Sequence, residues 1–208
     1  MTTFEILQLL QSEIHSTVFA TLDEYGLPQT CVIDLMLADD GGLYFLTARG
    51  KSFYDRLTAN PFVAISGMRG SDTLSTLAIS LRGAVRNIGK GRLAEIFEKN
   101  PYMAKIYPTE ESRGALEVFQ IYQGEGEYFD LGQLPPYRQS FSFGGADTQK
   151  NGYCIIPENC IGCQECRSVC PVGCISDTIP RTIDSAHCLH CGNCLRICPV
   201  KAVERLGK

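Results

Sequence analysis

The 208-residue sequence lacks the features that mark membrane-spanning, exported or nucleic-acid-binding proteins. No apolar run approaches the ~18 residues that a membrane helix needs. Residues 1–20 have no basic front and include Glu5 and Glu13, so they do not form a signal peptide. The net charge of -4, without a basic patch, argues against a nucleic-acid surface. We therefore expect a cytoplasmic protein with no membrane and no nucleic-acid partner.

Cysteine is the one residue type whose distribution is unusual. The rest of the composition, with 44% hydrophobic and 20% charged residues, is that of an ordinary globular protein. The chain has 11 cysteines, and all but Cys31 and Cys154 lie between residues 160 and 198. Cytoplasmic thiols stay reduced, so clustered cysteines in such a chain are expected to be metal ligands rather than disulfides.

The clustered cysteines form two arrays of the same spacing. CIGCQECRSVCPVGC, residues 160–174, contains C-x2-C-x2-C-x3-C-P, and CLHCGNCLRICP, residues 188–199, repeats it. This spacing resembles that of bacterial two-cluster ferredoxins, in which the fourth cysteine of each array ligates the other cluster. The resemblance covers about residues 152–205 and implies two [4Fe-4S] clusters. The implied ligands are Cys160, Cys163, Cys166 and Cys198 for one cluster, and Cys188, Cys191, Cys194 and Cys170 for the other.

Structural zinc is the alternative for these cysteines. Zinc ribbons use pairs of C-x-x-C, but they do not need a third cysteine and a Cys-Pro at this spacing, repeated twice. The spacing therefore favours iron-sulfur clusters. Cys154 and Cys174 remain unassigned. Cys174 matches Ala202 in the repeat, so we interpret it as a small buried side chain, with a redox-active or spare ligand as the alternative.

The residues before the arrays alternate short strands with turn signals and few helices. An amphipathic helix is expected near the N-terminus, and residues 134–145, rich in proline, glycine and aromatics, are interpreted as a linker. A final hairpin is predicted at residues 115–131, with Gly124 and Gly126 in its turn. The other expected elements are strands at 16–22, 28–37, 43–47, 61–68 and 75–88, and helices at 51–60 and 91–107.

These elements predict a mainly β protein of two domains. Residues 1–146 are expected to form a small antiparallel barrel with a few helices, because short strands recur at close spacing. Residues 147–208 are expected to form a small α+β ferredoxin-like domain that holds the two clusters.

The barrel resembles the FMN-binding split barrel of the pyridoxamine 5'-phosphate oxidase family. The likeness spans roughly residues 15–131 and is carried by four stretches: GLP at 26–28, TCVIDLM at 30–36, YFLTARGKS at 44–52 and LTANP ending at Pro61. The resemblance implies a homodimer with FMN in the groove between its subunits. It places one strand against the flavin ring and the turn after the YFLT strand around the phosphate.

The residues that this resemblance assigns to FMN fall into two groups. Cys31, Val32, Ile33 and Asp34 are implied at the ring, and Thr47, Arg49, Lys51 and Ser52 at the phosphate. Gly50-Lys51-Ser52 also offers amides, an ammonium and a hydroxyl to an anion at a helix start. It is not a nucleotide P-loop, because Phe45 stands where that motif needs glycine. Arg82, in mid-strand, either faces the flavin or forms a salt bridge on the strand face.

The chain departs from the oxidase pattern at its substrate-related positions. Ser52 and Phe53 stand where the oxidases have an Arg-Lys pair, Cys31 stands where they have an arginine, and the chain has no tryptophan. These departures argue against pyridoxamine phosphate as the substrate more than against FMN.

The implied clusters transfer single electrons, and the implied flavin accepts one or two. Together they predict an iron-sulfur flavoprotein. We expect a reductase of a small organic acceptor, fed through the clusters by an external low-potential donor or partner protein, although the reverse electron flow fits the sequence equally. The alternatives are a non-catalytic electron carrier or redox sensor, an oxidase of the pyridoxamine phosphate type, and a barrel that binds haem or a deazaflavin. The sequence indicates no side chain that must act as catalytic acid or base.

Overall fold

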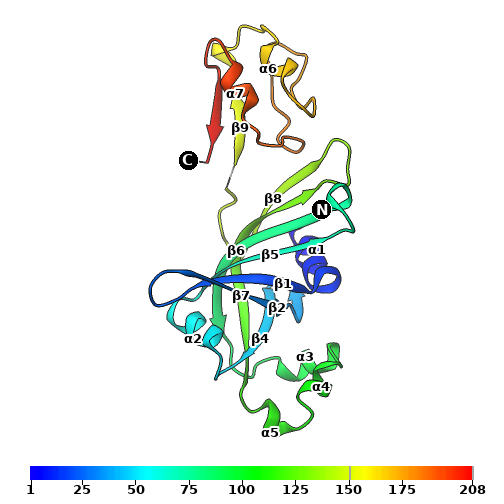
Figure 1. Ribbon diagram of the computed structural model, residues 1–208, viewed down its shortest axis with the longest axis vertical. Helices are drawn as coiled ribbons and strands as arrows, with labels where there is room; N and C mark the ends of the chain where they lie inside the picture. The colour runs from blue at the N-terminus through cyan, green and yellow to red at the C-terminus, as the bar shows by residue number, and fades with distance from the viewer. Residues whose placement is uncertain (150, 208) are drawn as a thin grey trace. The chain divides into compact units, whose positions relative to one another are not determined.

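The protein is described by a computed structural model covering residues 1–149 and 151–207. It is mainly β, as the sequence predicts, with a curled antiparallel half-barrel sheet and few helices (Figure 1). The eight-stranded sheet has the order β2-β1-β5-β6-β7-β4-β3, and β8 pairs with β7. Its strands are β1 (Ser16–Leu22), β2 (Pro28–Asp34), β3 (Leu37–Asp39), β4 (Gly42–Ala48), β5 (Phe62–Arg69), β6 (Leu77–Asn87), β7 (Leu116–Asp130) and β8 (Tyr137–Phe143).

An aromatic core fixes the strands on which the candidate flavin residues lie. Phe19 of β1, Phe45 of β4 and Phe119 of β7 are fully buried, with ring centroids 4.8 Å apart for Phe19 and Phe45 and 5.6 Å apart for Phe45 and Phe119. Phe53 of α2 (Ser52–Ala59) packs on the same rings. The turn between β4 and α2 is therefore held at both ends by buried side chains.

The helices are short and mostly lie at the edges of the sheet. The predicted helix at residues 91–107 is interrupted, because Pro101 follows Asn100 and forms a turn between two shorter helices. The N-terminal helix continues into one turn of π-helix at Leu10–Ile14. The remaining helices of the first 146 residues are α1 (Thr3–Leu9), α3 (Leu93–Lys99), α4 (Met103–Ile106) and α5 (Glu110–Arg113), with a 3-10 turn at Thr73–Ser75.

The predicted hairpin turn at Gly124 and Gly126 is wrong. Strand β7 runs without interruption through both glycines, and the chain instead turns after Asp130 into β8, which occupies much of the predicted linker. A β-carbon at Gly126 would lie 2.4 Å from the Ser80 carbonyl oxygen and 2.6 Å from the Phe141 ring. These glycines thus permit close approach of neighbouring strands and do not mark a turn.

The chain divides into two compact units. The first comprises residues 1–69, 78–127 and 141–147, and the second comprises residues 70–77, 128–140 and 148–208. In the second unit, β9 (Gly152–Ile155) pairs antiparallel with β10 (Val203–Leu206), and the two cysteine arrays lie between them along the chain. The arrays contain α6 (Glu165–Ser168) and α7 (Asn193–Ile197), and a 3-10 turn at Pro157–Asn159 precedes the first.

The second array is bonded to residues at the start of β8. The backbone N–H of Arg138 donates to the Ala186 carbonyl at 2.7 Å, and His187 Nδ1 donates to the Pro136 carbonyl at 3.0 Å. The Tyr137 and His187 rings lie edge to face with centroids 5.9 Å apart. These contacts fix the loop that leads into Cys188. In residues 1–149 and 151–207, no helix has the length and apolarity needed to cross a membrane.

Candidate functional site

The two cysteine arrays adopt the same backbone conformation. Left-handed residues recur at matching places in the two arrays, 28 residues apart, the distance between Cys160 and Cys188. The matching pairs with positive φ are Gly162 and His190, Gln164 and Gly192, and Gly173 and Lys201. Only half of these positions are glycine, so the fold holds the other three in a conformation that side chains disfavour. The sequence repeat is therefore a structural repeat.

Each array contributes to two cavities, and each cavity draws cysteines from both arrays. One cavity, with about 320 Å³ of empty space of which part is open to solvent, is lined by Cys160, Cys163, Cys166 and Cys198. The other, also about 320 Å³, is lined by Cys188, Cys191, Cys194 and Cys170. Each cavity thus groups three cysteines of one array with the fourth cysteine of the other.

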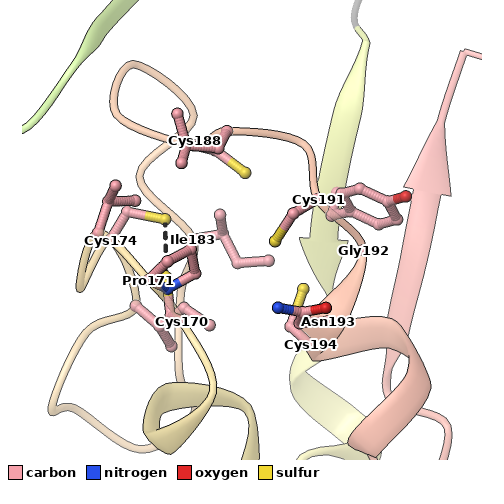
Figure 2. Close-up of a pocket in the computed structure, with 13 residues that line it drawn as sticks. Cys170, Pro171, Cys174, Ile183, Cys188, Cys191, Gly192, Asn193 and Cys194 are labelled. Carbon is pink, nitrogen blue, oxygen red and sulfur yellow. Dashed lines mark hydrogen bonds between the residues drawn. The ribbon is translucent and has the colours of Figure 1, made fainter. Parts of the chain in front are cut away.

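The second cavity has a fifth thiol. Cys174 lies on its wall, and its sulfur is 3.5 Å from that of Cys170 (Figure 2). Burial, together with the neighbouring Cys170 thiol, raises the pKa of Cys174 far above its usual range. Burial alone would raise the pKa of Cys170, but amide hydrogen bonds from Val172 and Cys174 and the Cys174 thiol bring it below its usual value.

The cavity walls offer further hydrogen bonds to sulfur. The backbone N–H of Ala202 donates to Cys198 Sγ at 3.2 Å, and that of His190 to Cys188 Sγ at 3.4 Å. Hydrogen bonds from the Arg181 and Gly162 amides lower the pKa of Cys160. Amides aimed at thiolate sulfur stabilise the anionic form that binds iron.

The donor set of the cavities fits iron-sulfur clusters. In the part of the chain that the structure describes, no three or more histidine, cysteine, aspartate or glutamate side chains are grouped as ligands of one ion. The thiols instead stand around two cavities that are otherwise lined mostly by apolar side chains such as Ile155, Val203 and Ile183. A buried guanidinium, that of Arg181, lies at the first cavity, where a cluster with four thiolates would supply the negative charge that it needs.

A second group of polar side chains gathers where β4 meets α2. Thr47 is 2% exposed, and its hydroxyl has no hydrogen-bond partner in residues 1–149 and 151–207. Arg56 donates from Nε to the Thr21 hydroxyl at 2.8 Å and from an Nη to the Ser52 hydroxyl at 3.2 Å. A β-carbon at Gly50 would meet no atom within 4 Å, so this turn is open to an approaching group.

Lys51 and Arg56 lie near β2, the edge strand that carries the predicted contacts to the flavin ring. Burial raises the pKa of the Cys31 thiol, while the charges of Arg56 and Lys51 act to lower it, which places both cations near β2. Val32 is exposed, and Ile33 and Asp34 are partly exposed, at the end of the same strand. Asp34 accepts from the Ser16 hydroxyl at 2.6 Å and from the Tyr102 hydroxyl at 3.0 Å. The structure therefore brings Cys31, Lys51, Ser52 and Arg56 into one neighbourhood.

Two of the predicted arginines have carboxylate partners. Arg49 donates to Glu117 at 3.0 Å and to the Gly114 carbonyl at 2.9 Å, on the side of β4 that faces β7. Arg82 donates twice to Glu125 Oε1, at 2.8 and 2.6 Å, from β6 to β7. The contact of Arg82 is therefore a salt bridge on the strand face, one of the two alternatives that the sequence allows.

Sequence reasoning missed two cations. Arg56 lies one helical turn after Ser52. This i, i+4 spacing from a candidate phosphate-binding residue is the sequence feature that identifies Arg56. Arg181 precedes Cys188 by the seven residues that separate Tyr153 from Cys160. The signal for Arg181 was therefore its position within the repeat.

Comparison with known proteins gives two family matches. Residues 3–128 match the profile of pyridoxamine 5'-phosphate oxidase. Residues 153–176 and 181–204 each match the profile of a 4Fe-4S binding domain. A search of curated proteins finds no match.

Two solved structures share the barrel fold with TM-scores above 0.5, and a third match is weaker. A NimC/NimA family protein from Clostridium acetobutylicum is 23% identical over 67% of this chain and 92% of its own, with a TM-score of 0.57. A heme binding protein from Mycobacterium smegmatis is 17% identical over 68% of this chain and 58% of its own, with a TM-score of 0.53. A pyridoxamine 5'-phosphate oxidase-related, FMN binding protein from Nostoc punctiforme is 11% identical over 70% of this chain and 95% of its own, with a TM-score of 0.47.

Proposed function

The chain belongs to the pyridoxamine 5'-phosphate oxidase family, and from this premise we propose that it is a cytoplasmic iron-sulfur flavoprotein with two [4Fe-4S] clusters and FMN. It acts as a reductase: a low-potential one-electron donor supplies the clusters, and FMN delivers electron pairs to a small organic acceptor. The observation that carries the proposal is the pair of cavities, each lined by three cysteines of one array and the fourth of the other.

The barrel residues support FMN rather than an uncharged ligand. The open turn at Gly50, the Lys51 ammonium, the Ser52 hydroxyl and the Arg56 guanidinium together suit a phosphate, which such groups bind through charge-assisted hydrogen bonds. The buried Thr47 hydroxyl lacks a partner in the described residues, so it is free to donate to a ligand. Backbone of β2 from Cys31 to Asp34 would contact the ring. FMN exchanges one or two electrons and so links single-electron clusters to two-electron chemistry.

An exposed apolar face supports a homodimer. On β1 and β2, Val18 and Val32 are cross-strand partners, and Val32 is 67% exposed. Phe62 and Met68 of β5 are also exposed, the latter by 63%. Adjacent exposed apolar side chains on neighbouring strands mark an interaction surface. We assign this surface to a second subunit, which would place the β2 residues, and the ring that they contact, at the interface.

The first test is the cofactor content of protein purified without oxygen. We expect a broad visible absorption that dithionite bleaches, iron and sulfide for two clusters, and about one FMN per chain released by heat. Cys198→Ser should remove the iron of one cluster, whereas Cys154→Ser, which changes a cysteine outside both arrays, should leave the iron content intact.

The other outcomes separate the alternatives. Flavin with zinc in place of iron would overturn the cluster assignment. Clusters with haem or another chromophore would overturn FMN. Both cofactors without turnover of any acceptor, but with electron exchange to a partner protein, would replace the reductase by an electron carrier.

A further inference from the structure

The two cluster cavities differ in charge. The side chain at the same place in each repeat is Arg181 at the first cavity and Tyr153 at the second. The residues that line the second cavity include neither lysine nor arginine. The backbone of the two repeats is the same. The two cavities therefore differ in the charge of one side chain, a neutral ring in one and a cation in the other.

Arg181 is buried and has no counter-ion among the residues that the structure describes. Its residue is 3% exposed, one Nη donates to the Ser176 carbonyl at 2.7 Å, and Nε has no partner in residues 1–149 and 151–207. No carboxylate of these described residues forms an ion pair with it. Arg181 and Cys160 line the same cavity. A buried cation of this kind needs an anion beside it.

We propose that Arg181 is the counter-charge of the cluster held by Cys160, Cys163, Cys166 and Cys198, and that it makes this cluster the first of the two to be reduced. Reduction adds one electron, from a low-potential one-electron donor, and one negative charge. A fixed cation in a poorly solvated site favours that added charge, and cluster potentials follow local charge and hydrogen bonding.

The second cavity has a feature that favours reduction of its own cluster, but it acts more weakly than Arg181. The Cys174 thiol next to Cys170 also favours a more negative cluster, but S–H is a weak and uncharged donor. A full charge acts more strongly than such a hydrogen bond, so the first cluster retains the higher potential. The inference rests on the proposed two-cluster content and assigns the order of reduction within it.

The test is a redox titration of the whole anaerobic protein, in which paramagnetic NMR of the cysteine β-protons identifies the cluster that is reduced first. We expect two one-electron steps, the more positive on the cysteines of the first cavity. Arg181→Gln should shift that step negative by a tenfold change in the reduction equilibrium or more, about 59 mV per tenfold. Arg181→Lys should retain most of the wild-type value, and Arg205→Gln, an exposed arginine of β10 that lines neither cavity, should move neither step by more than about twofold.

Each outcome decides one claim. Wild-type protein without iron defeats the proposed function. Intact clusters with the more positive step on Cys188, Cys191 and Cys194 defeat the role of Arg181, as does an unchanged step in Arg181→Gln. If Arg181→Gln does not assemble the first cluster, the wild-type order of reduction, which needs no variant, still decides the inference.

Discussion

At the scale of single residues, the chemistry of the candidate flavin site rests on cations and hydroxyls that one turn brings together. Lys51 is the N-cap residue of α2 with no side-chain hydrogen bond to the helix, so its ammonium remains available to a ligand. Arg56 is fixed beside it by Thr21 and Ser52. The sequence predicts Lys51 and Ser52 at the phosphate because an anion site at a helix start has a local signature, whereas the pairing of Arg49 with Glu117 depends on strands far apart in the chain.

Replacing Lys51 tests this site. Lys51→Gln should weaken FMN binding about tenfold to a hundredfold, because a hydrogen bond to a charged group contributes about 1.5–3 kcal/mol. Binding of riboflavin, which has no phosphate, should be unchanged. Flavin fluorescence during titration of deflavinated protein measures both. Lys105→Gln, an exposed lysine of α4, is the matched control. Equal losses for FMN and riboflavin would show that Lys51 acts on the fold or the ring rather than on the phosphate.

A substitution of Cys174 tests whether this thiol is a cluster ligand or only lies next to one. Its position in the repeat is that of Ala202, and its sulfur contacts Cys170. Cys174→Ala should therefore retain the iron of both clusters, while Cys194→Ala should lose the iron of one. Iron and sulfide analysis after anaerobic purification gives the comparison. Loss of iron from Cys174→Ala would make Cys174 a ligand and would require a new assignment of Cys170.

At the scale of elements, glycines account for the largest error of the sequence reading. The sequence predicts a turn at Gly124 and Gly126 because glycine near polar residues usually marks one. In the fold they lie within β7, where Phe141 and Phe143 of β8 and carbonyls of β6 occupy the space of the missing side chains. That packing is set by the neighbouring strands, so local sequence does not contain it. The short strands with clear alternation, such as β1 and β5, were predicted almost to the residue.

A side chain at Gly126 should destabilise the barrel. The new β-carbon of Gly126→Ala would overlap the Ser80 carbonyl and the Phe141 ring, and such overpacking costs about 1–3 kcal/mol. Gly50→Ala is the matched change, because its β-carbon meets no atom within 4 Å. Denaturant unfolding followed by circular dichroism should show a lower midpoint for Gly126→Ala alone. Equal midpoints for the two variants would contradict the tight packing of β7.

At the scale of the whole molecule, the sequence predicted the fold class of both parts because each has a strong periodic signal. The cysteine spacing specifies a repeat, and short strands with turns specify a barrel. It did not predict that residues 70–77 and 128–140 group with the second unit. That grouping depends on contacts such as Arg138 to Ala186 and His187 to Pro136, which join segments about fifty residues apart and leave no local pattern.

The core cluster around the cysteine arrays contains few purely apolar side chains. Four of the eight buried residues of this cluster are cysteines, Cys166, Cys174, Cys188 and Cys194, and the other four are Ile155, Ile175, Ala202 and Val203. Small domains with such cores need metal, because the free energy of metal binding is also free energy of folding. The eight-stranded sheet has its own aromatic core and does not share this requirement.

Removing the clusters should therefore unfold one part of the chain and spare the other. After anaerobic oxidation and chelation of the iron, we expect fast amide hydrogen exchange in β9 and β10, and unchanged protection in β1 and β4. Mass spectrometry of peptides from these strands measures both in one sample. Removal of FMN with the iron retained is the control, and it should leave β9 and β10 protected. Persistent protection of β9 and β10 without iron would show that this unit folds without metal, and the cysteines would then be a binding site on a preformed scaffold rather than its core.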